Sequence, residues 1–209
     1  MVLKVCGIRN QNNLEDLIKI HPDFIGFIFF EKSKRHVAEF PNVEFPNTIK
    51  KVGVFVNETH KVIIEKVKSH DLNVVQLHGD ETPAYCHILK NKLGCRIEIF
   101  KAFSIDEKFD FKSTQAYEEV CSAFVFDAKG RERGGNGVKF NWKMLSDYQG
   151  ATPYLLSGGI GLYDAELISE FMQTTAAEKC LGVDVNSGFE LEPGLKNIEE
   201  LKQFKELLP

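Results

Sequence analysis

The stretch over residues 122–137 combines residue types that could form a reactive site. An apolar run of strand-forming residues, 123–126, ends on the carboxylate of Asp127. A glycine cluster, Gly134, Gly135 and Gly137, follows within ten residues. Glycine permits backbone conformations that let main-chain N–H groups approach an anion closely. An acid at a strand end beside a glycine loop therefore predicts a ligand site. The alternative is a strand end with an exposed aspartate and a flexible turn.

Two further glycine-bearing turns lie near the end of the chain, Ser157–Gly161 and Asp184–Gly188. If they follow the last two strands of a barrel, they match the usual phosphate cradle, in which backbone N–H groups and a short helix N-terminus hold the anion. Two tight turns that simply need glycine are the alternative. The first interpretation favours an anionic, phosphate-bearing ligand.

Eight apolar segments of strand length must position these residues. The expected strands cover residues 3–6, 24–29, 51–56, 73–78, 96–101, 123–126, 154–157 and 181–185. The expected helices start near Asn10, Asn57, Thr82, Thr114, Phe140, Asp164 and Asn197. On the first strand, a period of two puts Lys4 and Cys6 on one face and Leu3 and Val5 on the other.

One connection lacks the signal of a helix. Pro41 and Pro46 forbid a continuous helix over residues 37–50, so we expect a loop with at most a short turn there. Elsewhere strands alternate with helices and no hairpin signal separates two strands.

This alternation of strands and helices predicts one (β/α)8 (TIM) barrel domain over residues 1–209, with a parallel sheet and an irregular second helix. A doubly wound open sheet is the alternative fold. Polar residues recur where the expected strands end, which favours the barrel, because all those ends then meet on one rim. They are Cys6, Gln76, His78, Lys101, Asp127, Ser157 and Asp184.

Composition narrows the class of ligand. A net charge of -4 gives no electrostatic reason to expect nucleic acid, and 43% hydrophobic with 27% charged residues is typical of a soluble globular protein. No run is long enough to cross a membrane, and Met1 leads directly into the first strand without a signal peptide. The five scattered cysteines contain no C-x-x-C pair, which favours a reducing cytoplasm and no structural metal. We therefore expect a small-molecule ligand.

At the level of motifs, the chain resembles the phosphoribosylanthranilate isomerase family of tryptophan biosynthesis. The matching segments span nearly the whole chain: 4–9, 33–35, 52–56, 75–79, Asp127 with 134–137, 156–160, and 182–188 with Pro193-Gly194. The chain departs from the family pattern at Asn136, usually threonine, and at Asn141, usually aspartate; neither position is expected to carry a proton. The loop 129–133 is also more charged than in the family.

The resemblance implies an Amadori rearrangement of a phosphosugar, with no cofactor and no metal, in a monomer or homodimer. Such a reaction needs one acid and one base on opposite sides of the sugar. By this resemblance Asp127 would protonate the ring oxygen and Cys6, as a thiolate, would take the C2 proton. The other implied site residues bind substrate: Arg35 at the anthranilate carboxylate, Gln76 and His78 in the pocket wall, Asp184 at the sugar hydroxyls, and Gly158, Gly159, Ser187 and Gly188 at the phosphate.

Some of these residues have plainer interpretations. Cys6 alone would be an inert core cysteine, and Arg35 a surface arginine. Because a free thiol has a pKa of about 8.5, Cys6 needs a positive neighbour or helix N-termini to ionise near neutral pH. Lys4 is one candidate, although it could simply pair with a buried acid such as Asp184.

Two other functions fit the same fold. One is a phosphosugar aldolase that uses Lys101 or Lys4 as a Schiff-base amine. The other is a non-enzymatic sensor of a phosphate ligand.

Overall fold

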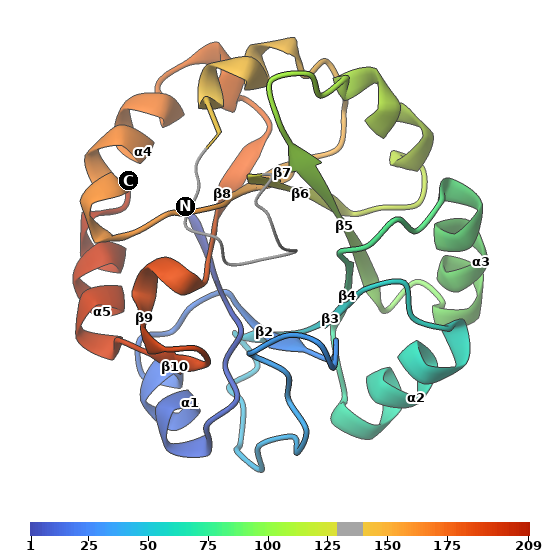
Figure 1. Ribbon diagram of the computed structural model, residues 1–209, viewed down its shortest axis with the longest axis vertical. Coiled ribbons are helices and arrows are strands. Elements are labelled where there is room, and N and C mark those ends of the chain that lie inside the picture. Colours follow the sequence, from blue (N-terminus) through green and yellow to red (C-terminus); the bar gives the residue numbers. More distant parts are fainter. Residues whose placement is uncertain (129–139) are drawn as a thin grey trace.

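The predicted strands close into a parallel barrel in the computed structural model, which describes residues 1–128 and 140–209 (Figure 1). Strands that follow one another in the sequence are neighbours in the sheet, and β8 closes the ring by pairing with β1, where Lys4 lies opposite Asp184. The (β/α)8 barrel is confirmed, and the doubly wound open sheet is excluded because no edge of this sheet is left open.

The barrel strands lie close to their predicted positions. They are β1 (Val2–Cys6), β2 (Phe24–Ile28), β3 (Lys50–Phe55), β4 (Val74–Leu77), β5 (Glu98–Ile105), β6 (Ala123–Ala128), β7 (Tyr154–Ser157) and β8 (Cys180–Val185). The α-helices that surround them are α1 (Gln11–Ile18), α2 (His60–His70), α3 (Pro83–Leu93), α4 (Ala165–Met172) and α5 (Ile198–Leu207). Short 3₁₀ helices complete the outer layer: η1 (Phe111–Tyr117), η2 (Trp142–Asp147), η3 (Leu162–Asp164), η4 (Thr175–Ala177) and η5 (Ser187–Phe189).

The connection between β2 and β3 contains no helix within its described residues 29–49, as the two prolines predict. Phe40 covers the barrel in place of a helix: its ring centroid lies 4.6 Å from that of Phe27 and 4.2 Å from that of His70. The aromatic cluster therefore replaces the second helix as the cover of β2.

Two predicted helices are 3₁₀ rather than α. Hydroxyl side chains inside them bond the backbone of the preceding turn: Thr114 Oγ1 donates to Phe111 O, and Ser146 Oγ to Lys143 O. Such bonds compete with regular helix geometry, and each segment has room for only two turns.

The predicted helix caps are correct at Asn10, Thr82 and Asn197, whose side chains each accept from a backbone N–H of the first turn. The predicted cap at Asn57 is wrong. The N-cap of α2 is Thr59, whereas Asn57 adopts a left-handed φ of 52° and its Oδ1 accepts from Asp80 N. Asparagine tolerates this left-handed conformation. The hydrogen bond from Asp80 N to the Asn57 side chain connects the loop after β3 with the loop after β4.

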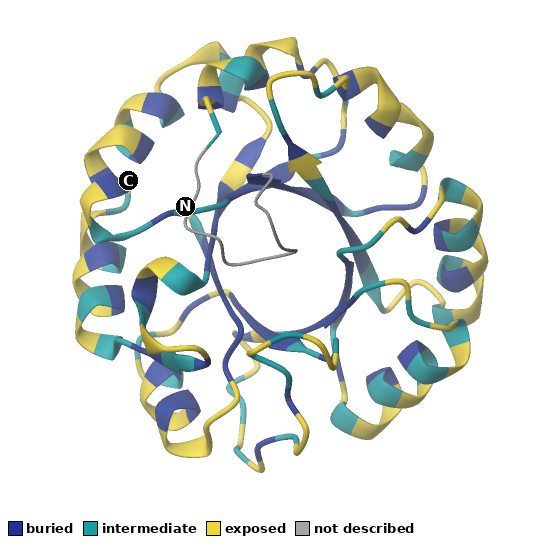
Figure 2. Ribbon diagram, in the orientation of Figure 1, coloured by how far each residue is buried: buried dark blue, intermediate teal, exposed yellow. Residues whose placement is uncertain are grey.

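Alternating strand residues build two cores, one inside the barrel and one between the strands and the helices. The barrel strands are buried along most of their length, as their dark blue colour in Figure 2 shows. On β1, Leu3 and Val5 belong to the outer core and Cys6 to the inner one, as the period of two predicts. Lys101 alternates with Phe100 and Ala102 of the inner core, so it faces the helices. The prediction that Lys101 lies on the rim with the other polar strand-end residues is therefore wrong.

A small hairpin that we did not predict follows η5. It consists of β9 (Glu190–Glu192) and β10 (Leu195–Lys196), joined through Pro193 and Gly194 (Figure 1). Gly194 has a φ of 87°, a conformation that favours glycine. Among the described residues, none of the helices has the length and apolar character needed to cross a bilayer.

Candidate active site

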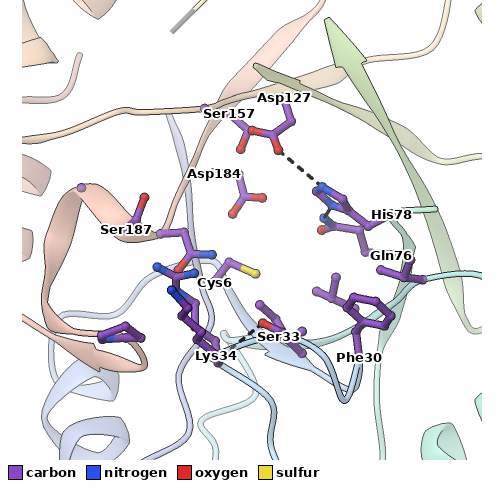
Figure 3. Close-up of a pocket in the computed structure, with 18 of the residues that line it drawn as sticks. Cys6, Phe30, Ser33, Lys34, Gln76, His78, Asp127, Ser157, Asp184 and Ser187 are labelled. Carbon is purple, nitrogen blue, oxygen red and sulfur yellow. Dashed lines mark hydrogen bonds and ion pairs between the residues drawn. The ribbon is translucent and has the colours of Figure 1, made fainter. Parts of the chain in front are cut away.

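A cavity of about 770 Å³ opens at the carboxyl ends of the barrel strands (Figure 3). Its lining brings together all ten predicted site residues: Cys6, Arg35, Gln76, His78, Asp127, Gly158, Gly159, Asp184, Ser187 and Gly188. The predicted glycine cluster at 134, 135 and 137, Asn136 and the charged loop 129–133 lie outside the described residues. Within the described ranges, no group of three acidic, histidine or cysteine side chains is arranged to hold a metal ion.

Cys6 ends β1 and its side chain is buried at the floor of the cavity. Gly26 on β2 gives the thiol room, because a Cβ there would lie 2.7 Å from Sγ. Lys4 also belongs to β1, and its ammonium donates to Asp184 Oδ1 at 2.8 Å and contacts the Cys6 thiol. Lys4 thus pairs with Asp184 and also acts on Cys6 as a positive charge.

These charges act on Cys6 in opposite directions. Burial raises the pKa of the Cys6 thiol above its ordinary value, while the Lys4 ammonium lowers it and the Asp184 carboxylate raises it. The net direction of the shift in the Cys6 pKa is upward. Burial also raises the pKa of Asp184, an effect that Lys4 opposes.

Asp127 lies opposite two polar residues, Gln76 of β4 and His78 just after the end of that strand. Its Oδ2 is 3.4 Å from His78 Nε2, and His78 Nδ1 is 3.0 Å from Gln76 Nε2 (Figure 3). Since the Gln76 amide donates to Nδ1, the neutral imidazole carries its proton on Nε2, facing the carboxylate. Gln76 Oε1 is buried and has no hydrogen-bond partner among the described residues. The three side chains form a chain of polar groups along the cavity wall.

The two late glycine turns lie together on another side of the cavity. Gly158 and Gly159 have φ values of 95° and 63°, conformations that favour glycine. A Cβ at Gly188 would collide with the carbonyl of Ile160, so the turns after β7 and β8 are packed directly against each other. These glycines are therefore required by the geometry of the turns as well as suited to binding an anion.

Arg35 lies in the loop after β2 and is only 11% exposed, so it is not a free surface arginine. Its guanidinium is held by Glu190 of the β9–β10 hairpin, with Nη2 2.6 Å and Nε 2.8 Å from the carboxylate oxygens. Arg35 therefore lines the cavity from a fixed position.

Sequence comparison identifies the family of this barrel. A family model described as N-(5'-phosphoribosyl)anthranilate (PRA) isomerase matches residues 3–206. An N-(5'-phosphoribosyl)anthranilate isomerase from Parabacteroides distasonis is 43% identical over 209 residues, covering 98% of this chain and 91% of that protein. The chain belongs to the phosphoribosylanthranilate isomerase family.

Solved structures agree with this assignment. Phosphoribosyl anthranilate isomerase from Thermotoga maritima matches with a TM-score of 0.80 and 30% identity, covering 99% of this chain and 98% of that chain. A second structure, with a TM-score of 0.78 and 28% identity over 98% of this chain and 96% of that chain, is an isomerase in complex with reduced 1-(o-carboxyphenylamino)-1-deoxyribulose 5-phosphate.

The structure explains one departure from the isomerase pattern. Asn141 is the N-cap of η2, and its Oδ1 accepts from Lys143 N at 3.1 Å. Asparagine and aspartate are equally good caps, so this exchange leaves the element intact.

The two lysines considered as Schiff-base amines are both engaged elsewhere. Lys4 is fully buried in its ion pair with Asp184. Lys101 lies outside the barrel, where its ammonium donates to Gly79 O and Ala102 O and lies 3.3 Å from Glu81. Neither presents a free amine to the cavity.

Sequence reasoning missed a charged group beside the cavity, formed by Asn186, Glu190 and Lys196. Lys196 Nζ is 2.8 Å from Asn186 Oδ1 and 2.7 Å from Glu190 Oε1. The Pro193-Gly194 pair, which marks a turn, was the available signal for the hairpin that carries two of these residues.

Proposed function

We propose that this chain catalyses the Amadori rearrangement of N-(5-phosphoribosyl)anthranilate to 1-(2-carboxyphenylamino)-1-deoxyribulose 5-phosphate, a step of tryptophan biosynthesis, with Asp127 as the acid and Cys6 as the base. One observation carries the assignment of roles. Cys6 from β1 and Asp127 from β6, strands well separated around the ring, line the same cavity together with two glycine turns.

The reaction requires only proton transfers. Asp127 donates a proton to the ring oxygen, the C1–O bond breaks, and the nitrogen lone pair forms a C1=N iminium. The Cys6 thiolate then removes the C2 proton, and the released electrons form a C1=C2 bond while the C=N pair returns to nitrogen. The resulting enolamine gives its hydroxyl proton to the Asp127 carboxylate and takes a proton at C1 from the Cys6 thiol, which yields the aminoketose and restores both residues. Atoms and electrons balance, so the proposal needs no cofactor or metal.

Phosphate binding is assigned to the two late turns. Gly158 and Gly159 after β7, with Ser187 and Gly188 after β8, supply close backbone approach at the site where such barrels commonly hold phosphate. The phosphate would anchor one end of the substrate and leave the sugar over Cys6.

The remaining cavity residues are assigned to the sugar and the anthranilate. Asp184 would accept from sugar hydroxyls, and Gln76 Oε1, which is buried without a partner among the described residues, offers a further acceptor beside His78. Arg35 would bind the anthranilate carboxylate, because a planar guanidinium matches a carboxylate and can also lie against an aromatic ring.

The decisive experiment is an absorbance or fluorescence assay with phosphoribosylanthranilate generated in place, because the compound is labile. We expect turnover that EDTA does not change. A sensor would bind the aminoketose product without converting the substrate at any enzyme concentration. An aldolase would give a covalent adduct on Lys4 or Lys101 after borohydride reduction, and such an adduct would overturn the isomerase mechanism.

We also propose that the enzyme works in the cytoplasm, as a monomer or homodimer. All five cysteines are free, as is usual in a reducing compartment. Sedimentation of the purified protein distinguishes the two oligomeric states.

A further inference from the structure

Together with Arg35, the charged group of Asn186, Glu190 and Lys196 connects three separate segments of the chain. Arg35 comes from the loop after β2, Asn186 from the loop after β8, and Glu190 and Lys196 from the two strands of the hairpin. Glu190 is at the centre: it accepts from Arg35, from Lys196 and from Gly194 N. None of these contacts includes the proposed acid or base.

Glu190 occupies only one edge of the Arg35 guanidinium. The carboxylate lies against the edge formed by Nε and Nη2, with Nε 2.8 Å from Oε1 and Nη2 2.6 Å from Oε2. Nη1 has no hydrogen-bond partner among the described residues. The edge formed by Nη1 and Nη2 can therefore accept a second carboxylate in a parallel two-bond arrangement, which is the most specific geometry for this pair of groups.

The aliphatic part of the Arg35 side chain is fixed as well as its guanidinium. A Cβ at Gly7 would lie 2.8 Å from Arg35 Cδ and 2.7 Å from Asn186 Oδ1, so the side chain passes closely over the backbone after β1. With the stem packed on Gly7 and one edge held by Glu190, the guanidinium has little freedom to rotate.

Lys196 in turn fixes Glu190. It is fully buried, and its three acceptors are Asn186 O, Asn186 Oδ1 and Glu190 Oε1. A buried ammonium requires a charged partner, so Glu190 must remain ionised in this place. Consistently, the pKa of Glu190 is lowered: burial raises it, but Arg35 and Lys196 together more than offset that effect.

We propose that Glu190 is a positioning residue that presents the free edge of Arg35 to the anthranilate carboxylate, and that Lys196 holds Glu190 for this task. The inference rests on the proposed function, in which Arg35 binds that carboxylate. Because Asn186 adjoins the proposed phosphate turn, the same group also sets the distance between the carboxylate site and the phosphate site.

The test is Glu190→Gln, which keeps the shape and removes the charge. We expect KM for phosphoribosylanthranilate, and Kd for reduced 1-(o-carboxyphenylamino)-1-deoxyribulose 5-phosphate, to rise about tenfold or more while kcat stays within about twofold. The matched control is Glu192→Gln, on the same strand but exposed, which should leave both constants unchanged.

Two double variants separate positioning from folding. In Glu190→Gln/Lys196→Met the buried ammonium is removed together with its partner, so stability should recover while KM stays high. In Arg35→Ala/Glu190→Gln, KM should be no higher than in Arg35→Ala alone, because Glu190 acts only through Arg35.

Three results would overturn the inference: unchanged KM in Glu190→Gln, tighter binding in Glu190→Gln, or recovery of KM in the double variant with Lys196→Met. Tighter binding would mean that Glu190 merely neutralises Arg35. Failure of the proposed function is distinguishable, because the wild-type protein would then not convert phosphoribosylanthranilate, whereas failure of this inference leaves wild-type turnover intact.

Discussion

At Cys6, burial and charge act against each other. A base that must take a proton from carbon needs its thiol ionised, yet burial raises the pKa of that thiol and the Lys4 ammonium offsets only part of the effect. Asp127 carries the opposite requirement, since it must be protonated to act as an acid.

The first prediction concerns the two proposed catalytic residues. Cys6→Ser and Asp127→Asn should each lower kcat by a factor of about 100 to 10,000, the usual contribution of one general acid or base. Affinity for the reduced product should change little in both, as titration calorimetry can measure. Cys95→Ser, at an exposed cysteine, is the control and should be fully active. Near wild-type turnover in either variant would reassign its role.

The second prediction is the titration of the Cys6 thiol. Alkylation by iodoacetamide requires the thiolate, so its rate follows the ionised fraction and rises with pH up to the pKa. In a Cys95→Ser background, we expect the midpoint for Cys6 to lie above that of an exposed thiol, since burial is the largest influence on its pKa and raises it. Mass spectrometry identifies the modified residue. A midpoint near pH 7 would mean that the free site already activates the thiol.

The third prediction concerns Arg35→Ala. Loss of a charge-assisted contact with the substrate carboxylate should raise KM by about tenfold to a hundredfold, with kcat much less affected because the acid and base remain in place. Steady-state kinetics test this directly. A fall in kcat at unchanged KM would contradict a binding role.

At the scale of elements, the site depends on turns whose backbone only glycine tolerates well. Gly158 has a φ of 95°, and a Cβ there would lie 2.5 Å from the backbone nitrogen of Ala128, next to Asp127. The turn after β7 is thus packed on the end of β6, so the turn proposed to bind phosphate and the position of Asp127, the proposed acid, depend on the same contact.

The fourth prediction compares two glycines. Gly158→Ala should raise KM at least about tenfold, because the turn must move away from β6 and a left-handed alanine adds strain of about 1–2 kcal/mol. Gly94→Ala, at a φ of 75° beyond the end of α3 with open space around it, should lose similar stability without a change in KM. Equal effects of both variants on KM would mean that only global stability is involved.

The elements also show how far sequence alone can predict this site. The strands, their inward faces and the glycine turns follow from local patterns, and motifs spread along the chain pointed to Cys6 and Asp127. Glu190 and Lys196 could not be found in this way, because their importance comes from contacts with a loop 155 residues away from Glu190 along the chain. The outward orientation of Lys101 followed from the strand period, but its place at a strand end suggested the rim.

At the scale of the whole molecule, the barrel closes where β1 meets β8, and a buried ion pair lies at that seam. Lys4 and Asp184 are opposite each other in the strand register and their side chains bond at 2.8 Å. A single buried charge without its partner is strongly unfavourable, whereas loss of the whole pair is often tolerated.

The fifth prediction is a double-mutant cycle across this seam. Lys4→Met alone should lower the free energy of unfolding by about 3–5 kcal/mol, and Lys4→Met/Asp184→Asn by clearly less. Urea unfolding measures the wild type, the single variants Lys4→Met and Asp184→Asn, and the double variant. Additive losses would show that the two side chains do not stabilise the seam as a pair.

The pairing of β1 with β8 also determines when the cavity can form. Lys4 and Asp184 are 180 residues apart along the chain. During synthesis the segment that carries Cys6, the proposed base, is therefore made long before β8, the strand with which it pairs. Until β8 docks, Lys4 has no buried counter-charge, Cys6 lies on an unfinished sheet, and the late phosphate turn does not yet exist. Because residues of β1 and β8 both line the cavity, the cavity is complete only when the ring is closed, so recovery of activity after dilution from denaturant should report that closure.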